Sequence, residues 1–250
     1  MAVSETRQAQ PVDPEVLELL RAVSTATLST QLYRRGFRNL FMHDVRPLRP
    51  DLRLVGQAFT LRYIPVREDL ERTGEFDNLT NEQRIAVESV GPGDVLVIDA
   101  RGDTRAGVLG NILAARIKAR GAAGIVTDGA FRDTPEIREL GIPAYARSQN
   151  ANLSISIHHP ADINVPVACG GVAVLPGDVI VGDAEGVIVI PRSVVEEVAR
   201  AAYEQERLEA FIYRKVVAGS SIIGVYPPNE ATLAEYEAFR QESEPGGPAR

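Results

Sequence analysis

The stretch GNILAARIKARGAAGIVTDGAFRD (residues 110–133) combines a helical pattern, a short apolar run and a turn. Apolar side chains at 108, 109, 112, 113 and 117 share one helical face, and Gly121 supplies a stop. We therefore predict a helix over 105–121. GIVTD (124–128) predicts a strand directly after it. A helix that leads straight into a buried strand is typical of a parallel βαβ unit.

The flanking segments extend this alternation. GPGDVLVIDA (91–100) is a turn followed by a nearly continuous apolar run, which predicts a strand buried on both faces. Alternating character over 55–66 and 142–148 predicts two further strands, and 134–141 predicts a short helix. Three apolar runs between turn residues in 170–191 add more β structure. The fold class is α/β, with parallel βαβ units.

Helical spacing predicts helices at both ends of the predicted sheet region. They cover 14–23, 24–36 and, as one long amphipathic helix, 193–219. Between the first strand and the next helix lies a polar segment, 67–83, which we expect to shape any ligand pocket.

We assign the predicted elements to a single domain over 14–220, with terminal extensions at 1–13 and 221–250. Within these extensions, 1–13 and 242–250 are predicted to be loosely attached.

Composition narrows the class of protein. The chain has 250 residues, 44% hydrophobic and 24% charged, and a formal net charge of −7. This balance favours neither nucleic acid nor an anionic membrane as a partner. One cysteine excludes a disulfide framework within the chain and indicates a reducing compartment. The polar N-terminal segment and the lack of a long apolar run lead us to expect a cytoplasmic protein.

The turn TDGAFRD (127–133) carries the best candidate chemistry, because ligands of parallel α/β sheets bind beyond the carboxyl ends of strands. Arg132 offers a forked donor for an anion, and Asp133 offers a hard oxygen ligand for Mg²⁺ or Mn²⁺. We expect no salt bridge between them, because neighbouring side chains point in different directions. A solvated turn is the alternative interpretation of the pair.

Other reactive residue types receive structural interpretations. Cys169 in ACGG is predicted to be a small buried thiol rather than a nucleophile. His158 and His159 are adjacent and cannot both face one metal from a regular strand, so a surface or turn position is expected. Asp183 and Glu185 are interpreted as turn residues, with assistance to a site as the alternative.

Residues 110–133, together with VPVACGGVAVLPGDVIVGDAEGVIVIPR (165–192), resemble a known family. It holds the 4-hydroxy-4-methyl-2-oxoglutarate/4-carboxy-4-hydroxy-2-oxoadipate aldolases and the regulator of ribonuclease activity A. The resemblance covers roughly 24–220. It implies a compact α/β/β fold with a swivelling-domain-like topology and a long C-terminal helix, assembled as a homotrimer or as a hexamer of two trimers.

The resemblance also implies roles for residues. Arg132 would bind a 2-oxo acid, Asp133 would bind Mg²⁺ or Mn²⁺, and a glutamate of the C-terminal helix would reach a neighbouring subunit's site. Glu206 matches that glutamate best, with Glu209 second. Backbone amides at the start of the preceding helix would hold the substrate carboxylate; this region is Gly110, Asn111, Ile112 and Leu113.

The function implied is a divalent-metal-dependent carbon–carbon lyase acting on a small 2-oxo acid. It would cleave a 4-hydroxy-2-oxo acid to pyruvate and decarboxylate oxaloacetate. Asn111 stands where such aldolases can carry an acidic residue, and an amide cannot act as a base. Two alternatives stay open: a non-catalytic, protein-binding regulator of a ribonuclease, and a dehydratase of sugar-acid metabolism on the same metal site.

Overall fold

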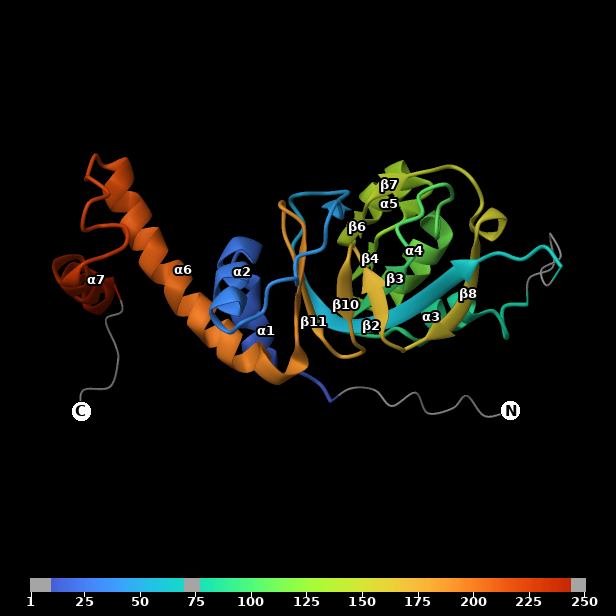
Figure 1. The fold of residues 1–250 in the computed structure, drawn as a ribbon, viewed down its shortest axis with the longest axis horizontal. Helices are drawn as coiled ribbons and strands as arrows, with labels where there is room; N and C mark the ends of the chain where they lie inside the picture. Colours follow the sequence, from blue (N-terminus) through green and yellow to red (C-terminus); the bar gives the residue numbers. More distant parts are fainter. Residues whose placement is uncertain (1–9, 70–76, 244–250) are drawn as a thin grey trace.

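A computed structural model describes residues 10–69 and 77–243 of the chain. Its centre is a mixed sheet in the order β1-β6-β4-β3-β2-β11-β12, with β8 also paired to β2 (Figure 1). The strands of this sheet are β1 (Arg46–Pro47), β2 (Leu54–Pro65), β3 (Asp94–Asp99), β4 (Gly124–Thr127), β6 (Ala144–Ala146), β8 (His158–Ile163), β11 (Val179–Gly182) and β12 (Val187–Ile190). Two small sheets pair β9 (Val167–Cys169) with β10 (Val172–Val174), and β5 (Ala130–Phe131) with β7 (Ser148–Gln149).

The βαβ units predicted from the sequence form the middle of this sheet. Strands β2, β3, β4 and β6 run parallel, while the pairs that involve β1, β8, β11 and β12 are antiparallel. The helices that connect the parallel strands are α3 (Glu82–Ser89), α4 (Asn111–Ala119) and α5 (Thr134–Leu140). The remaining helices are α1 (Pro14–Arg21), α2 (Thr25–Arg34), α6 (Val195–Val217) and α7 (Glu230–Ser243), with short 3₁₀ turns η1 (Ser154–Ser156) and η2 (Arg192–Val194).

The continuous apolar run in β3 is buried on both faces, as predicted. Leu96 and Ile98 belong to the core beneath α3, α4 and α5, whereas Val95 and Val97 face a second core shared with the β9–β10 hairpin. A third core joins the sheet to α1, α2 and the first half of α6. The fold is therefore α/β with parallel βαβ units and a long C-terminal helix.

Two stretches of similar sequence, PGDVLVIDA (92–100) and PGDVIVGDA (176–184), each form a turn followed by a strand. In the first, Gly91 N donates to Asp94 Oδ2 at 2.8 Å, and in the second Leu175 N donates to Asp178 Oδ2 at 2.9 Å. Each aspartate closes a turn at the start of a buried strand: Asp94 is the first residue of β3, and Asp178 directly precedes β11.

The largest differences from the prediction are the start of one helix and the presence of another. Helix α4 begins at Asn111 rather than 105, because Val108 and Leu109 are buried in a loop whose apolar spacing imitates a helix face. Helix α7 was not predicted within 221–250. It folds back on the distal half of α6 (Figure 1). There Phe211 contacts Phe239, with ring centroids 5.4 Å apart. Much of 1–13 and 242–250 lies outside the described residues.

Candidate functional site

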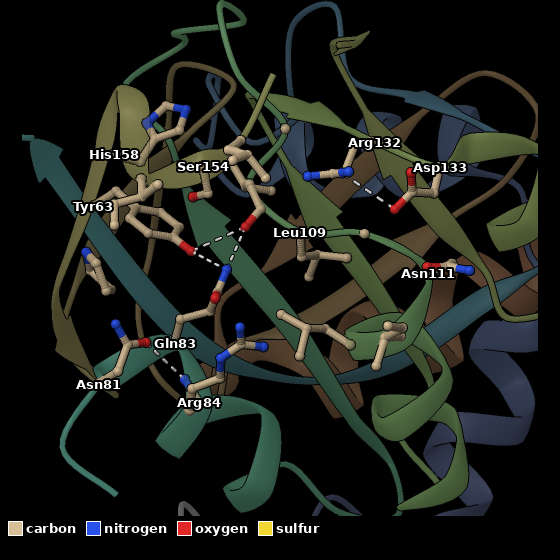
Figure 2. A pocket seen from close by; sticks show the side chains of 18 residues that line it. Tyr63, Asn81, Gln83, Arg84, Leu109, Asn111, Arg132, Asp133, Ser154 and His158 are labelled. Carbon is tan, nitrogen blue, oxygen red and sulfur yellow. Dashed lines mark hydrogen bonds and ion pairs between the residues drawn. The ribbon is translucent and has the colours of Figure 1, made fainter. Parts of the chain in front are cut away.

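A cavity of about 390 Å³ lies where the sequence places the candidate chemistry, beyond the carboxyl ends of the parallel strands. One wall consists of the 107–113 segment and the Arg132–Asp133 pair. The opposite wall comes from β2, the start of α3, and η1 with β8 (Figure 2). Segments far apart in the chain therefore meet around one cavity.

Arg132 and Asp133 both line this cavity, and they contact each other. Arg132 Nε lies 3.3 Å from Asp133 Oδ2, with both side chains about one-third exposed. The expectation that no salt bridge forms is therefore wrong. Asp133 has φ 53°, in the left-handed region, and this backbone reversal brings the two side chains to the same side. The turn presents a cation and a carboxylate as one unit.

The start of α4 lies directly against this pair. Gly110 is the N-cap, with φ −118° and ψ −171°, and no side chain caps the helix. A Cβ atom at Gly110 would stand 2.3 Å from Asp133 Oδ2, so the absence of a side chain lets the carboxylate approach. The first backbone N–H groups of a helix lack intrahelical acceptors and favour an anion. Asn111 is the first helical residue and lines the cavity.

The next two residues of α4 divide between the rim and the core. Ile112 also lines the cavity and is 79% exposed, so its apolar side chain forms part of the rim. Leu113 lines it too, and is partly buried against the core under α4. The predicted Gly110–Leu113 region thus borders the cavity as a whole.

A buried polar network fixes the segment that precedes α4. Gln83 Nε2 donates to Val108 O at 2.5 Å and to Tyr63 Oη at 2.7 Å, and Tyr63 Oη donates to the same carbonyl at 3.3 Å (Figure 2). Burial raises the pKa of Tyr63, so its hydroxyl stays protonated as a donor. The network holds the cavity floor in place.

His158 lies on the opposite wall, contrary to the expected surface or turn position. It begins β8, is 1% exposed, and packs against Tyr63 with ring centroids 5.4 Å apart. Neither ring nitrogen has a hydrogen-bond partner among the described residues. Burial lowers the pKa of His158, so the imidazole is neutral at neutral pH. Pairing of β8 with the end of β2 draws this residue inward.

Two buried carboxylates organise the loop that leads to the cavity. Asp128 accepts from Ala100 N at 2.8 Å and from Gly102 N at 3.0 Å, and Asp99 accepts from Arg101 N at 2.8 Å. Burial raises the pKa of Asp128, although these backbone donors oppose the shift. Cys169 lies nearby and is fully buried, as predicted, and burial raises the pKa of its thiol well above the ordinary value.

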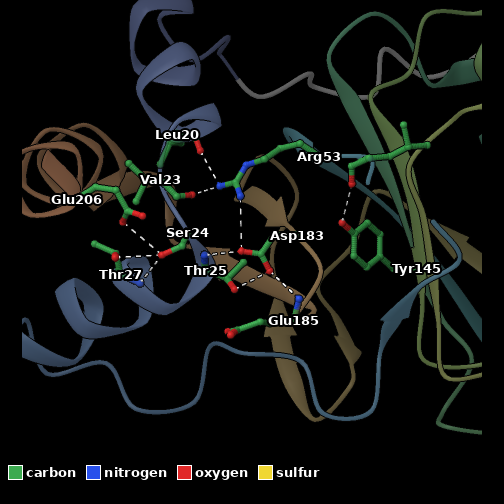
Figure 3. A network of polar contacts seen from close by, with 11 residues as sticks. Leu20, Val23, Ser24, Thr25, Thr27, Arg53, Tyr145, Asp183, Glu185 and Glu206 are labelled. Atoms are coloured by element: carbon green, nitrogen blue, oxygen red, sulfur yellow. Dashed lines mark hydrogen bonds and ion pairs between the residues drawn. The ribbon is translucent and has the colours of Figure 1, made fainter. Parts of the chain in front are cut away.

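Glu206, on α6, is not brought to the cavity within one chain. Its carboxylate accepts from Ser24 Oγ at 3.3 Å, beside the start of α2 (Figure 3). Asp183 belongs to the same region and is a structural residue, as expected. It accepts from Thr25 N at 2.8 Å and Thr25 Oγ1 at 2.9 Å, and its carboxylate lies 3.5 Å from Arg53 Nη1.

Sequence reasoning missed most of the opposite wall: Tyr63, Gln83, Arg84 and His158 were not identified as site residues. The expectation that 67–83 shapes the pocket did indicate part of this wall, because Asn81 and Gln83 both line the cavity. Residues 70–76 of that segment lie outside the described residues. No local motif marks these side chains, because the cavity gathers them from separate strands and helices.

Comparison with known proteins places the chain in a family. A profile of the RraA-like family, described as Aldolase/RraA, matches residues 25–189. This chain belongs to the RraA-like family. Its relatives include a putative 4-hydroxy-4-methyl-2-oxoglutarate aldolase of Halalkalibacterium halodurans, 36% identical over 186 residues, which are 74% of this chain and 81% of that protein.

Solved structures agree with the RraA-like assignment. Streptomyces coelicolor RraAS2, described as an unusual member of the RNase ES inhibitor RraA protein family, aligns with a TM-score of 0.75 at 36% identity. That alignment covers 82% of this chain and 100% of RraAS2. An uncharacterized protein from Pseudomonas syringae pv. tomato aligns with the same TM-score at 26% identity, covering 87% of this chain and 100% of that one. In the part of this RraA-like chain that the structure describes, no helix has the length and apolar character needed to cross a membrane.

Proposed function

We propose that this RraA-like chain is a divalent-metal-dependent carbon–carbon lyase that cleaves a 4-hydroxy-2-oxo acid to pyruvate. The observation that carries the proposal is the Arg132–Asp133 pair, held at 3.3 Å in a cavity bordered by the start of α4. One wall thus offers a forked cation, a carboxylate and helix N-terminal amides to the same small ligand. The aldolase name of the Halalkalibacterium relative supports this chemistry.

The residues at the cavity fit a weakly held, oxygen-preferring cation. Asp133 supplies one carboxylate, and the described residues contain no group of three or more His, Cys, Asp or Glu side chains that could hold a metal. One carboxylate suffices for Mg²⁺ or Mn²⁺, because such ions keep several waters and share ligands with the substrate. A cation held at Asp133 would supply Lewis-acid polarisation of the 2-oxo group.

The protein's own part in the reaction follows from the positions of these groups. The substrate carboxylate binds at the α4 amides, and the 2-oxo oxygen faces Arg132. The C3–C4 bond breaks, the 4-hydroxyl proton leaves, C4 becomes a carbonyl, and the electron pair forms an enolate on C2–C3. Arg132 stabilises the charge that develops on the C2 oxygen. Protonation at C3 completes pyruvate. Oxaloacetate would lose carbon dioxide through the same enolate.

A carboxylate that is free to act as a general base is missing from this site. Among the described residues that line the cavity, Asp133 is the one carboxylate, and it is paired with Arg132. We propose that Glu206 of a neighbouring subunit supplies this base in a homotrimer or hexamer, with Glu209 as second choice. Glu206 lies on α6, and its carboxylate accepts a hydrogen bond from Ser24 Oγ at 3.3 Å.

Mixing of two inactive variants tests the shared site. Asp133→Asn and Glu206→Gln proteins would each lose activity, and a mixture that is unfolded and refolded together would regain part of it if the residues act across subunits. No recovery, or full activity of Glu206→Gln alone, would place the base elsewhere.

A screen for pyruvate release tests the function itself. Purified protein would be treated with chelator, then assayed on oxaloacetate and on 4-hydroxy-2-oxo acids with and without Mg²⁺ or Mn²⁺. We expect metal-dependent pyruvate release. If no substrate yields pyruvate, two alternatives remain to be tested: a ribonuclease-binding regulator, which the RraA-like neighbour RraAS2 favours, and a dehydratase.

A further inference from the structure

A buried glutamine on α3 connects that helix to the wall that carries Arg132. Gln83 lies in the first turn of α3 and is 7% exposed. Its Nε2 donates to Val108 O at 2.5 Å and to Tyr63 Oη at 2.7 Å (Figure 2). The two protons of the amide nitrogen serve these two acceptors. Val108 lies in the loop directly before α4, so Gln83 ties α3 to the segment that leads into α4.

The segment before α4 lies between Gln83 and the turn of Arg132, and its backbone groups face both ways. Toward the turn, Val108 N donates to Ala130 O at 2.7 Å, and Leu109 O accepts from Arg132 N at 3.1 Å. Toward α3, Val108 O accepts from Gln83. One continuous path of hydrogen bonds and backbone therefore joins Gln83 to the backbone of Arg132.

Close packing leaves this path little freedom to adjust. A Cβ atom at Gly107 would stand 2.8 Å from Arg132 N and 2.9 Å from Arg132 Cβ, so the two backbones touch. A displacement of the segment before α4 would therefore displace Arg132 as well. The support of Gln83 is firm, because Ala86 and Val87 anchor α3 in the same core as Phe131, the residue before Arg132.

We propose that Gln83 is a positioning residue, which holds Val108 O so that Leu109 keeps Arg132 in place at the cavity wall. This inference rests on the proposed function for the role of Arg132. Tyr63 Oη donates to the same carbonyl, but at 3.3 Å it holds Val108 less firmly than Gln83 does at 2.5 Å. Gln83 acts on the reaction through Arg132 and needs no contact with the substrate.

Replacement of Gln83 by methionine tests the proposal in the full-length protein. Methionine keeps the length of the side chain and cannot donate, which leaves Val108 O with the longer hydrogen bond from Tyr63. The kcat for pyruvate release should fall by about tenfold, less than the roughly hundredfold loss for a 1 Å misplacement. KM should stay within about twofold, because Arg132 stabilises charge that develops in the transition state.

A double-mutant cycle distinguishes positioning of Arg132 from support of the fold. In protein that already carries Arg132→Lys, Gln83→Met should lower kcat by less than about threefold, because the residue it positions is gone. Equal losses in both backgrounds would overturn the inference. Tyr63→Phe should cost less than about threefold, and a loss as large as that of Gln83→Met would make Tyr63 the holder of Val108 instead.

Gln57→Met is the matched control. Gln57 lies on β2, accepts from Val12 N at 2.9 Å, and is not among the described residues that line the cavity. This variant loses a glutamine with a comparable hydrogen bond and should keep full activity. If Gln83→Met fails to fold, Gln83→Glu takes its place at pH 8, since an ionised carboxylate of similar shape cannot donate to Val108 O.

Crystal structures separate this inference from the proposed function. If wild-type protein releases pyruvate from no substrate, the lyase is rejected, and the position of Arg132 still reports on Gln83. The backbone of Val108 and Leu109 and the Arg132 side chain should be displaced in Gln83→Met relative to wild type, and unchanged in Gln57→Met. Arg132 in its wild-type position in Gln83→Met would overturn the inference, whatever the activity.

Discussion

Replacement of Gly110 by alanine should inactivate the site while leaving the fold intact. The added Cβ would stand 2.3 Å from Asp133 Oδ2 and 3.1 Å from Arg132 Cγ. Ordinary contact begins at 3.4 Å, so the carboxylate must move by about 1.1 Å. A misplacement of ~1 Å in a catalytic constellation can lower the rate by roughly a hundredfold, and we expect a loss of that size in pyruvate release.

The backbone gives no reason for Gly110→Ala to unfold the protein. With φ −118° and ψ −171°, Gly110 is extended, a conformation that alanine adopts. Alanine is a poorer N-cap than glycine, which costs about 1 kcal/mol and lowers the melting temperature by roughly 2–4 °C for a chain of this size. Circular dichroism and a melting curve would establish that the fold survives.

Gly91→Ala is the matched control. A Cβ atom at Gly91 would meet Asp94 Oδ2 at 3.8 Å, an ordinary contact, and it lies away from the cavity. This variant should keep full activity. If Gly110→Ala kept activity within about threefold of wild type, the close approach of Asp133 to α4 would have no catalytic meaning, and the reasoning would be refuted.

Three further predictions concern charge. Removal of divalent metal with a chelator should abolish pyruvate release, and added Mg²⁺ or Mn²⁺ should restore it; full turnover in the chelated sample would reject metal dependence. Arg132→Lys should reduce kcat/KM by about a hundredfold, because lysine loses the planar fork, and a loss below about threefold would limit Arg132 to a structural role. Asp103 has its pKa lowered to about 2, mainly by the hydrogen bond from Arg105. Its stabilising contribution is therefore present above pH 3.8 and is lost as the pH falls toward 2. Melting curves should show that wild-type protein loses more stability than Asp103→Asn between pH 4 and 2, and parallel losses would contradict this linkage.

The sequence predicted those elements whose own pattern decides their structure. Strand β3 is a continuous apolar run, and α6 has apolar residues at helical spacing over 23 residues. The prediction from sequence failed where contacts between distant parts of the chain determine the local structure. Val108 and Leu109 continue the apolar spacing of α4, yet Gln83 binds the carbonyl of Val108 and keeps that segment out of the helix. Helix α7 is fixed by its contact with Phe211, 25 residues or more away along the chain.

The site was predictable on one side of the cavity and not on the other. Arg132 and Asp133 belong to a single turn, so one short motif carries both. Arg84 and His158 reach the opposite wall through the pairing of β8 with β2 and the position of α3, which no local pattern reveals. Within the 127–133 turn, the adjacent positions of Arg132 and Asp133 led to the wrong prediction that they form no ion pair. The sequence does not reveal the positive φ of Asp133, which brings the two side chains together.

That positive φ gives a last argument for the function of Asp133. A residue with a side chain is strained in the left-handed region, by about 1–2 kcal/mol for most types and less for aspartate. Asp133 precedes α5, yet its carboxylate makes no capping hydrogen bond to that helix, so the fold gains little from it. Asp133→Gly should therefore leave the melting temperature within a few degrees of wild type, since glycine adopts this conformation without strain. Metal-dependent pyruvate release should nevertheless be lost. A variant that melted much earlier would show that the Arg132 ion pair stabilises the turn, and one that stayed active would show that the carboxylate serves neither the metal nor the substrate.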